Sequence, residues 1–370
     1  MKSLLITLNC FLISTLAICQ EKKVIALFTE APITLDANLN EPDWQRAMPA
    51  DAFWQYFPKD SVQATHQTEI RFLFSERTLY VGIKVYSQGD NYVVPSLRRD
   101  FRAGGSDNVT LMFDTFNDGN NAFLFGTNPE GVRREALVSG GGTSLRGFTT
   151  SWDTKWRGET KQYDGYYISE WAIPFSAFKF KTGETQWRFN SYQFDTQDNT
   201  RNTWIRIPQN QFIFNLAYMG ILEFEKPLGS SKSPISIIPY TNAITGKDFE
   251  NTSSFSDITF GGDMRFTVGN SLNLDLTFNP DFSQVEVDQQ VTNLTRFEIN
   301  LPERRQFFIE NSDLFADFGD PQNANPFFSR RIGIAQDSLG NTIANDILAG
   351  VRLSGKLNND FRVGLLNMQT

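Results

Sequence analysis

The chain has 370 residues and a formal net charge of −8, with 34 Lys and Arg against 42 Asp and Glu. An acidic chain lacks the clustered basic surface that phosphate binding requires, so nucleic acid is excluded as a partner. Both cysteines, Cys10 and Cys19, lie within the first 20 residues. A chain cleaved after Cys19 would therefore contain no disulfide, no cysteine nucleophile and no zinc–thiolate site.

The N-terminus has the three parts of a secretory signal. Lys2 supplies the positive charge, Leu4 to Ile18 the apolar stretch, and Ala17-Ile18-Cys19 the cleavage pattern. We therefore predict a cleaved signal peptide over residues 1–19. A lipoprotein signal with Cys19 lipidated is the alternative, which the bulky Ile18 disfavours. No other long apolar run follows, so a helical membrane span is not expected.

His66 is the only histidine, and it sits in a polar run over residues 63–68. A histidine-based catalytic triad would need this residue, and the sequence has no nucleophile-elbow motif. We expect His66 to be a solvated residue at the edge of a loop. The sequence predicts no cofactor and no metal site.

From Val24 to about Glu225 the sequence alternates short apolar strands with turn signals such as Asn117-Asp118-Gly119-Asn120. This pattern predicts an all-β fold, with an antiparallel β-sandwich over residues 20–225. A short helix is expected at Pro42–Met48. The predicted strands are Glu69–Phe74, Thr78–Tyr86, Asn108–Asp114, Ala122–Asn128, Lys155–Gln162, Tyr166–Ile173, Trp187–Asp195 and Tyr218–Phe224.

Two groups of acidic residues are candidates for a calcium site and for a catalytic carboxylate pair. Oxygen atoms of Asp114, Asn117, Asp118 and Asn120 suit Ca²⁺, but their spacing does not match a calcium loop and favours a hairpin turn. Asp107 with Asp114 is a conceivable glycosidase pair, which the separation of the two carboxylates decides.

Residues 226–234, KPLGSSKSP, form a Pro/Gly/Ser-rich linker. Beyond it, strands with one apolar and one polar face are expected within residues 235–370. In residues 272–279, for example, Leu272, Leu274 and Leu276 alternate with Asn273, Asp275 and Thr277. Such alternation is typical of outer-membrane β-barrel strands, although soluble sandwiches show it too. The predicted strands are Ile235–Thr241, Ile258–Val268, Leu272–Phe278, Ile347–Leu357 and Phe361–Gln369.

Five strands are fewer than the roughly eight that close a membrane barrel. We therefore expect residues 235–370 to be the N-terminal part of an incomplete barrel, and the chain to be a piece of a longer protein. A long insertion at residues 281–331 interrupts these strands. We expect it to fold into the barrel lumen through Arg–carboxylate pairs, and a solvated surface loop is the alternative.

Two resemblances support this division. NPDFSQVEVD, LPERRQFFIENSDLF, FFSRRIGI and ILAGVRLSGKL resemble the start of an uncharacterised Gram-negative outer-membrane barrel family. The N-terminal half is similar to family 9 carbohydrate-binding modules. The segments that carry this similarity are Ile33–Trp44, Asp107–Asp114, Asn128–Gly131, Glu170–Phe175 and Gly220–Phe224.

The second resemblance implies glycan contacts by Trp204 and Arg206 and by the amides of Asn190 and Gln193, since aromatic rings stack on sugars while amides and Arg bind hydroxyls. Trp152 is a further candidate, because a tryptophan in a Gly/Ser/Thr-rich loop is often exposed for binding.

The expected function is that of a carbohydrate-binding outer-membrane protein, exported to the outer membrane with its sandwich in the periplasm and acting in carbohydrate uptake or catabolism. Its expected partners are a saccharide or glycan and the membrane. Two alternatives remain. One is a glycoside hydrolase, because family 9 modules often occur together with glycoside hydrolases. The other is a non-catalytic protein-binding scaffold. No catalytic residue is identified, so an enzyme is the less favoured reading.

Overall fold

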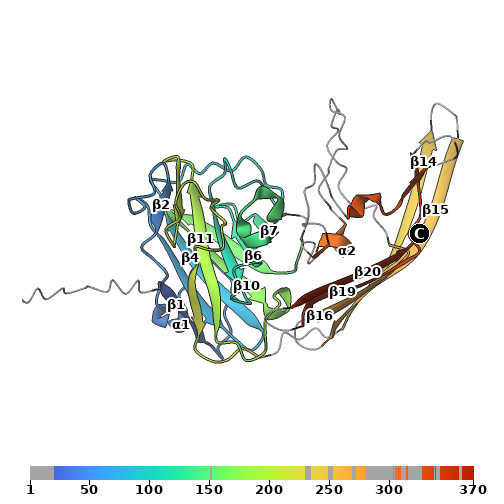
Figure 1. The fold of residues 1–370 in the computed structure, drawn as a ribbon. Coiled ribbons are helices and arrows are strands. Elements are labelled where there is room, and N and C mark those ends of the chain that lie inside the picture. Colours follow the sequence, from blue (N-terminus) through green and yellow to red (C-terminus); the bar gives the residue numbers. More distant parts are fainter. Residues whose placement is uncertain are drawn as a thin grey trace, which may run out of the picture.

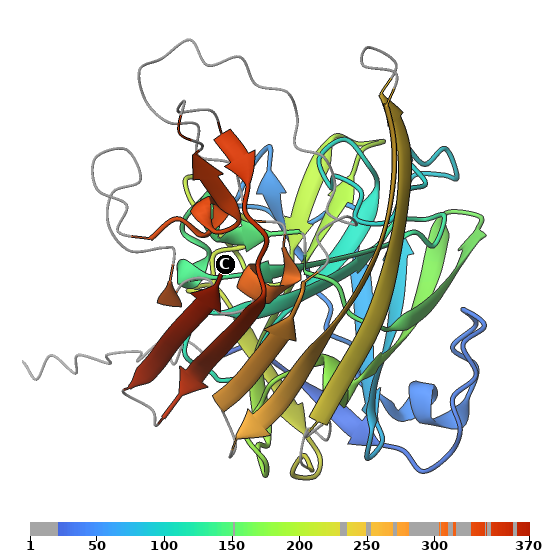
Figure 2. The same cartoon turned by 90° about the vertical axis from the view of Figure 1, so that its right-hand side faces the viewer.

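The computed structural model describes residues 21–150, 152–229, 235–248, 253–268, 272–280, 303, 305–309, 314–315, 327–336, 338, 342–357 and 361–370 (Figures 1 and 2). The predicted signal peptide and much of the predicted insertion at 281–331 lie outside these residues. The fold is all-β, as the sequence predicts. Its helices are short, namely α1 (Pro42–Arg46), α2 (Gln306–Ile309) and a few single 3₁₀ turns.

The N-terminal region is a β-sandwich built from thirteen strands. They are β1 (Lys23–Phe28), β2 (Trp54–Phe57), β3 (Thr68–Phe74), β4 (Thr78–Tyr86), β5 (Asn108–Asp114), β6 (Ala122–Thr127), β7 (Arg133–Val138), β8 (Phe148–Thr149), β9 (Arg157–Tyr163), β10 (Tyr166–Pro174), β11 (Gln186–Asp195), β12 (Thr200–Thr203) and β13 (Gly220–Phe224). The strand order is β8-β7-β6-β5-β11-β13-β1-β3-β4-β10-β9, and β12 joins β11 to β2.

Strand β1 connects the two layers of the sandwich. Its first residues pair with β13 and its last with β3, and both pairings are parallel. The expected purely antiparallel sandwich is therefore wrong at this strand. Strand β1 lies between the edge strands β13 and β3 of the two layers and pairs with both. Because β13 and β3 run in the same direction as β1, both pairings are parallel.

Aromatic side chains fill the space between the layers. Phe72 on β3 lies with its ring centroid 5.0 Å from that of Phe189 on β11 and 6.2 Å from that of Phe113 on β5. Thr127 on β6 donates a hydrogen bond to Ser169 on β10 across the same interface, at 3.0 Å. These contacts show that β5, β6 and β11 face β3 and β10, with a large apolar core between them.

The outer face of the layer that contains β3, β4 and β10 is partly covered by the N-terminal segment that contains α1. Trp44 Nε1 donates to Glu170 Oε1 at 3.1 Å, and the backbone N–H groups of Asp36 and Ala37 donate to Glu170 Oε2, each at 3.0 Å. Gly82 lies beneath this cover, where a Cβ would come within 2.7 Å of Leu39. The buried Glu170 therefore holds the opening segment to β10.

The outer face of the layer that contains β5, β6 and β11 is covered by a loop. Met112, Leu124 and Tyr192 form a second apolar cluster there with Phe214 and Leu216 from the loop before β13. Leu216 N donates to Gly141 O at 2.9 Å, which joins this loop to the segment after β7. Segments outside the strands thus cover part of each outer sheet face of the sandwich.

The C-terminal region contains a curved antiparallel sheet in the order β14-β15-β16-β19-β20 (Figure 2). Its strands are β14 (Ile235–Asp248), β15 (Ser253–Val268), β16 (Leu272–Phe278), β19 (Ala349–Lys356) and β20 (Arg362–Gln369), and a separate hairpin pairs β17 (Ile334–Gln336) with β18 (Thr342–Ala344). All five expected strands are present. The first two are longer than predicted, because β14 and β15 pair along an extended hairpin.

We predict that Glu170→Ala lowers the free energy of unfolding by about 3 kcal/mol, because it leaves two buried N–H donors and a third, part-buried one without their acceptor. Urea unfolding followed by tryptophan fluorescence measures the loss. Glu159→Ala is the matched control, since Glu159 stands opposite Glu170 on β9 but is exposed, and it should stay within about 0.5 kcal/mol of the parent chain. Equal losses in the two variants would contradict the role assigned to Glu170.

Candidate functional site

Six of the seven tryptophans are buried, which corrects two of the expected glycan contacts. Trp152 is 4% exposed and packs against Phe123 and Phe125, with ring centroids 5.4 and 5.8 Å away. Trp204 is 1% exposed and lies between Phe189, 5.0 Å away, and the ammonium group of Lys22, 5.1 Å away. Neither ring offers a free face for a pyranose to stack on.

The two predicted amides are also buried, and both are engaged within the protein. Asn190 donates to Tyr218 O at 2.8 Å and accepts from Ile205 N at 3.0 Å, so it holds the loop after β12 against β11. Gln193 accepts from Asn202 Nδ2 at 2.6 Å. The structure places both close to Trp204, as the resemblance implied, but as internal hydrogen-bonding groups and not as ligands for sugar hydroxyls.

Arg206 is the one predicted contact that lies on the surface. Its Nε donates to Asp60 O at 2.6 Å, and its guanidinium stands 5.7 Å from the ring of Trp54, within cation–π range. Trp54 is the remaining tryptophan, and it is partly exposed on the short strand β2. No sequence signal identified it, because it lies 152 residues before Arg206.

We name the surface formed by Trp54, Tyr56, Asp60 and Arg206 the Trp54–Arg206 face. Trp54 and Tyr56 are two residues apart on β2, so their side chains share one side of the strand. The Tyr56 hydroxyl donates to Gln211 O at 2.6 Å, and burial raises its pKa. Asp60 accepts from Gln209 N at 3.0 Å. The surface thus combines an aromatic ring with a fixed guanidinium and a carboxylate.

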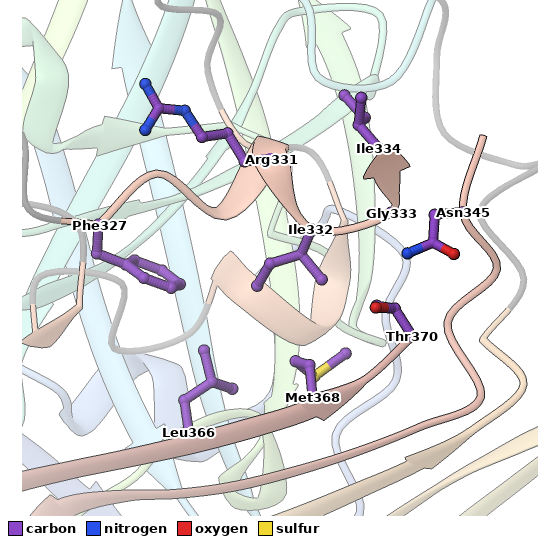
Figure 3. A pocket seen from close by; sticks show the side chains of 9 residues that line it. All are labelled: Phe327, Arg331, Ile332, Gly333, Ile334, Asn345, Leu366, Met368 and Thr370. Atoms are coloured by element: carbon purple, nitrogen blue, oxygen red, sulfur yellow. The ribbon is translucent and has the colours of Figure 1, made fainter. Parts of the chain in front are cut away.

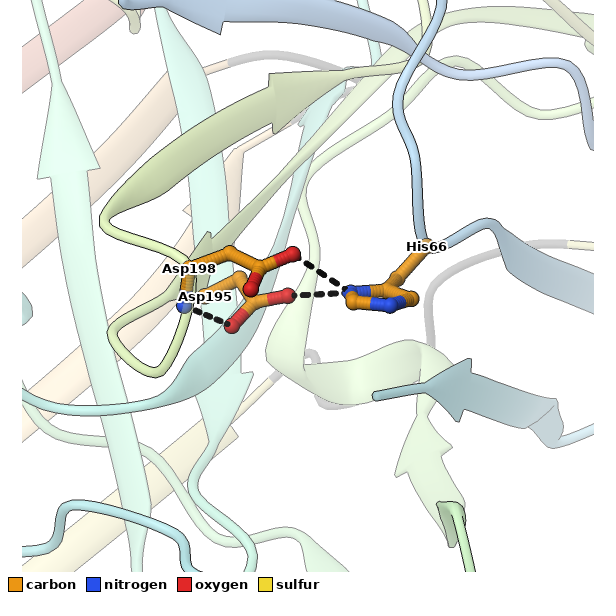
Figure 4. Close-up of side chains that lie close together, drawn as sticks. All are labelled: His66, Asp195 and Asp198. Carbon is orange, nitrogen blue, oxygen red and sulfur yellow. Dashed lines mark hydrogen bonds and ion pairs between the residues drawn. The ribbon is translucent and has the colours of Figure 1, made fainter. Parts of the chain in front are cut away.

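A second polar group lies at one end of the sandwich. His66 is half-buried, and its Nδ1 lies 3.0 Å from Asp195 Oδ2 and 3.1 Å from Asp198 Oδ2 (Figure 4). The expectation of a solvated histidine is therefore wrong. His66 follows β2 whereas the two aspartates close the turn between β11 and β12, so only the fold brings the three together. They are also the described side chains whose ligand atoms cluster closely enough to hold a metal ion.

A third cluster surrounds the fully buried Glu135 on β7. Arg99 pairs with Glu135 and, at 2.7 Å, with Asp153, while Trp156 Nε1 donates to Glu135 at 3.2 Å. Burial, followed by the hydrogen bond that a protonated Glu135 donates to Asp153, raises the pKa of Glu135 to about 7. Since Glu135 has no exposed surface, these contacts hold the loop of Trp152 and Trp156 onto β7 and leave no room for a substrate.

The acidic groupings noted in the sequence do not form catalytic or calcium-loop geometry. Asp107 and Asp114 stand at opposite ends of β5, about 23 Å apart at strand spacing, far beyond the separation of a glycosidase pair. Asp114 accepts hydrogen bonds from Phe116 N, Asp118 N and Gly119 N within its own hairpin turn. This carboxylate therefore stabilises the turn.

The five-stranded sheet has its polar face buried and its apolar face exposed. Asp275 on β16 stands opposite Arg265 on β15 and Arg352 on β19. Arg265 Nε donates to Asp275 Oδ1 at 2.5 Å, and Arg352 Nη2 donates to Oδ2 at 2.7 Å. Asp275 is 4% exposed and Arg352 only 1%. By contrast, Phe260 on β15 and Phe278 on β16 are 69% and 66% exposed.

Described parts of the predicted insertion lie on this polar face. Phe307 of α2 stands 5.2 Å from the guanidinium of Arg352, and Phe315 contacts the backbone at Gly364 on β20. Arg305 makes a close pair with Glu303, at 2.7 Å, and donates to Ser329 O at 2.6 Å. These contacts join two described parts of the insertion to each other, and its folding into a barrel lumen stays a prediction.

A cavity of about 360 Å³ lies beside β20 (Figure 3). Its lining joins Phe327, Ile332, Leu366 and Met368 with Arg331 and Asn345, and also includes Gly333, Ile334 and Thr370. Figure 3 shows the Arg331 side chain pointing away from Met368. The lining of the cavity thus mixes apolar side chains with the amide of Asn345 and the hydroxyl of Thr370.

Comparisons with known proteins bear on both regions. Residues 233–370 match a family model described as a domain of unknown function, DUF5916. No curated protein matches the chain. Among the described residues, none of the helices has the length and hydropathy of a membrane span.

Three solved structures are similar to 55% of the chain. One is a protein from Bacteroides uniformis described as carbohydrate-binding, covered in full, with 13% identity and a TM-score of 0.46. The others are structures of a family 9 carbohydrate-binding module from Caldicellulosiruptor kristjanssonii, each with 14% identity. Its complex with glucose is covered over 96% with a TM-score of 0.40, and its complex with cellotriose over 94% with a TM-score of 0.37.

We predict that stability falls as pH rises through the range in which Glu135 titrates. Because its pKa is raised to about 7, the folded chain retains a proton that the unfolded chain releases near pH 4.5. The stabilisation is complete below about pH 4.5 and is lost as pH rises through 7, by about 3 kcal/mol at most. Urea unfolding of the parent chain and of Glu135→Gln from pH 5 to 8 tests this. The difference in unfolding free energy should change with pH, and parallel profiles would refute the assignment.

Proposed function

We propose that this chain belongs to an outer-membrane β-barrel protein whose N-terminal sandwich binds a saccharide in the periplasm during carbohydrate uptake or breakdown. The inverted five-stranded sheet, apolar outside and polar inside, is the observation that carries the membrane location. The Trp54–Arg206 face supports the ligand class, together with the sequence resemblance to family 9 carbohydrate-binding modules.

The exposed face of the sheet suits hydrocarbon better than water. Ile258 and Phe260 on β15, Phe278 on β16 and Leu365 on β20 are each at least 60% exposed. A contiguous apolar surface of this kind marks a protein or membrane contact. Strands β14 and β15, with 14 and 16 residues, exceed the roughly 9–11 residues that cross a bilayer as tilted strands.

The opposite face is what a barrel interior requires. Membrane barrels alternate apolar outward and polar inward residues along each strand. The Arg265–Asp275–Arg352 row places a carboxylate between two guanidinium groups, so the buried Arg352 has an ion-pair partner on this face. A soluble sheet would reverse this arrangement, with its apolar face toward a core.

The saccharide proposal rests on the chemistry of the Trp54–Arg206 face. An aromatic ring stacks against the C–H face of a pyranose, while a guanidinium and a carboxylate bind its hydroxyls. Arg206 and Asp60 are fixed by hydrogen bonds to neighbouring backbone, so little side-chain entropy is lost on binding. Loops cover much of both sheet faces of the sandwich, whereas this surface lies open at the edge of β2.

We predict that Phe260→Arg destabilises the barrel protein to which this chain belongs, folded in lipid vesicles, by about 2 to 4 kcal/mol, because a charge then faces hydrocarbon. Thr259→Arg is the matched control, since the adjacent residue has the same depth but faces the polar side. Protease protection and urea unfolding in vesicles measure both variants. Equal effects, or a parent chain that partitions into the aqueous fraction, would refute the membrane assignment.

We predict that Trp54→Ala and Arg206→Ala each weaken saccharide binding at least tenfold, because each removes a contact that the other cannot replace. A glycan array of the full chain identifies a ligand, and calorimetry gives the affinities. Phe212→Ala, which removes a partly exposed ring elsewhere on the sandwich, should bind like the parent chain. Absence of binding across the array, or unchanged binding by both variants, would overturn the saccharide proposal and leave the membrane proposal intact.

A further inference from the structure

We propose that His66, Asp195 and Asp198 bind a divalent transition-metal cation of the zinc class. The three side chains come from two segments, the loop between β2 and β3 and the turn between β11 and β12 (Figure 4). An imidazole nitrogen with two carboxylates is a donor set that zinc and related cations accept, whereas Ca²⁺ prefers oxygen alone. This inference is independent of the proposed membrane and saccharide functions.

The distances between donor atoms fit a shared cation. Zinc lies about 2.0–2.2 Å from imidazole nitrogen and carboxylate oxygen, so two ligands at tetrahedral or octahedral angles stand about 3.0–3.4 Å apart. His66 Nδ1 lies 3.0 Å from Asp195 Oδ2 and 3.1 Å from Asp198 Oδ2. All the ligand atoms lie within 4.8 Å of one another. A cation would therefore need only small side-chain movements.

The site is partly prepared before any cation binds. Asp195 is 2% exposed, and its second oxygen accepts from Asp198 N at 3.2 Å, which fixes the orientation of this carboxylate. His66 and Asp198 are each about one-fifth to one-quarter exposed, at 19% and 25% of the side chain, which gives a cation a path from solvent. With a neutral imidazole the cluster carries two negative charges, which a divalent cation compensates.

A buried hydroxyl beside the cluster is a second, independent indication. Tyr167 is 1% exposed, and its hydroxyl has no hydrogen-bond partner among the residues that the structure describes. Asp107 and Asp195 lie close enough to this hydroxyl for their charges to add to the effect of burial, which raises the pKa of Tyr167. Buried hydroxyls are rarely left unpaired. A cation at Asp195 would carry a coordinated water that could donate a hydrogen bond to the Tyr167 hydroxyl oxygen.

Zinc retention by the full chain in detergent tests this site. The purified chain without an affinity tag is equilibrated with ZnCl₂, dialysed and analysed for metal by mass spectrometry. We expect one equivalent per chain in the parent, and the same in Asp164→Asn, which alters an exposed aspartate in the turn between β9 and β10. His66→Gln and Asp198→Asn should bind zinc at least about 100-fold more weakly, since even indirect partners of metal ligands contribute 10–100-fold.

Two further measurements keep the test decisive. Circular dichroism shows whether each variant folds, and Asp198→Asn is the safer variant because its side chain is partly exposed. Substitution with Co²⁺ gives visible absorption that reports the ligand set, and its loss in His66→Gln assigns the nitrogen donor. Retention of zinc by a folded His66→Gln chain at the parent level would overturn the proposal, as would absence of retention by the parent.

Discussion

The pairing of Asp275 with two arginines determines how the C-terminal sheet can be arranged. Arg265, Asp275 and Arg352 stand in one row across three strands, so one carboxylate pairs with both guanidinium groups. A buried guanidinium without this carboxylate would cost several kcal/mol. Because the row occupies one face, period-2 alternation places Leu274, Leu276 and their neighbours on the other. The position of this row therefore determines both which face of the sheet is polar and which is apolar. On the polar face, α2 places the ring of Phe307 over the guanidinium of Arg352.

The two regions of the chain use β-alternation in opposite senses. In the sandwich, strands such as β5 are buried along their whole length, because the core covers one face and the loops cover the other. In β16 the buried positions are polar and the exposed positions apolar. Strands with the same backbone geometry therefore occur in both regions, and the outward-facing side chains distinguish the sandwich from the C-terminal sheet.

The sequence predicts much of the fold because strand patterns are local. Thr78–Tyr86, Asn108–Asp114 and Leu272–Phe278 are found as predicted, and α1 ends two residues before its predicted end. The parallel pairings of β1 were not foreseen, since a strand's partners depend on where the chain enters the fold. Similarly, nothing local distinguishes a loop tryptophan that reaches inward, such as Trp152, from one that stays exposed.

The candidate sites were harder to predict because long-range contacts create them. Trp54 approaches Arg206 only through the pairing of β2 with β12, and His66 meets Asp195 across 129 residues. Residue types at short spacing carry no trace of such contacts.

Strand β12 and the turn before it connect the His66–Asp195–Asp198 cluster to the Trp54–Arg206 face. Asp198 lies in the turn that leads into β12, whose Thr203 pairs with Trp54 on β2. His66 closes the same loop in which Gln63 forms a β-bridge with Trp54. A cation held between His66 and Asp198 would therefore restrain both segments that flank the Trp54 ring. Because any such restraint is reciprocal, a ligand that orders the Trp54–Arg206 face would tighten the metal site by the same factor.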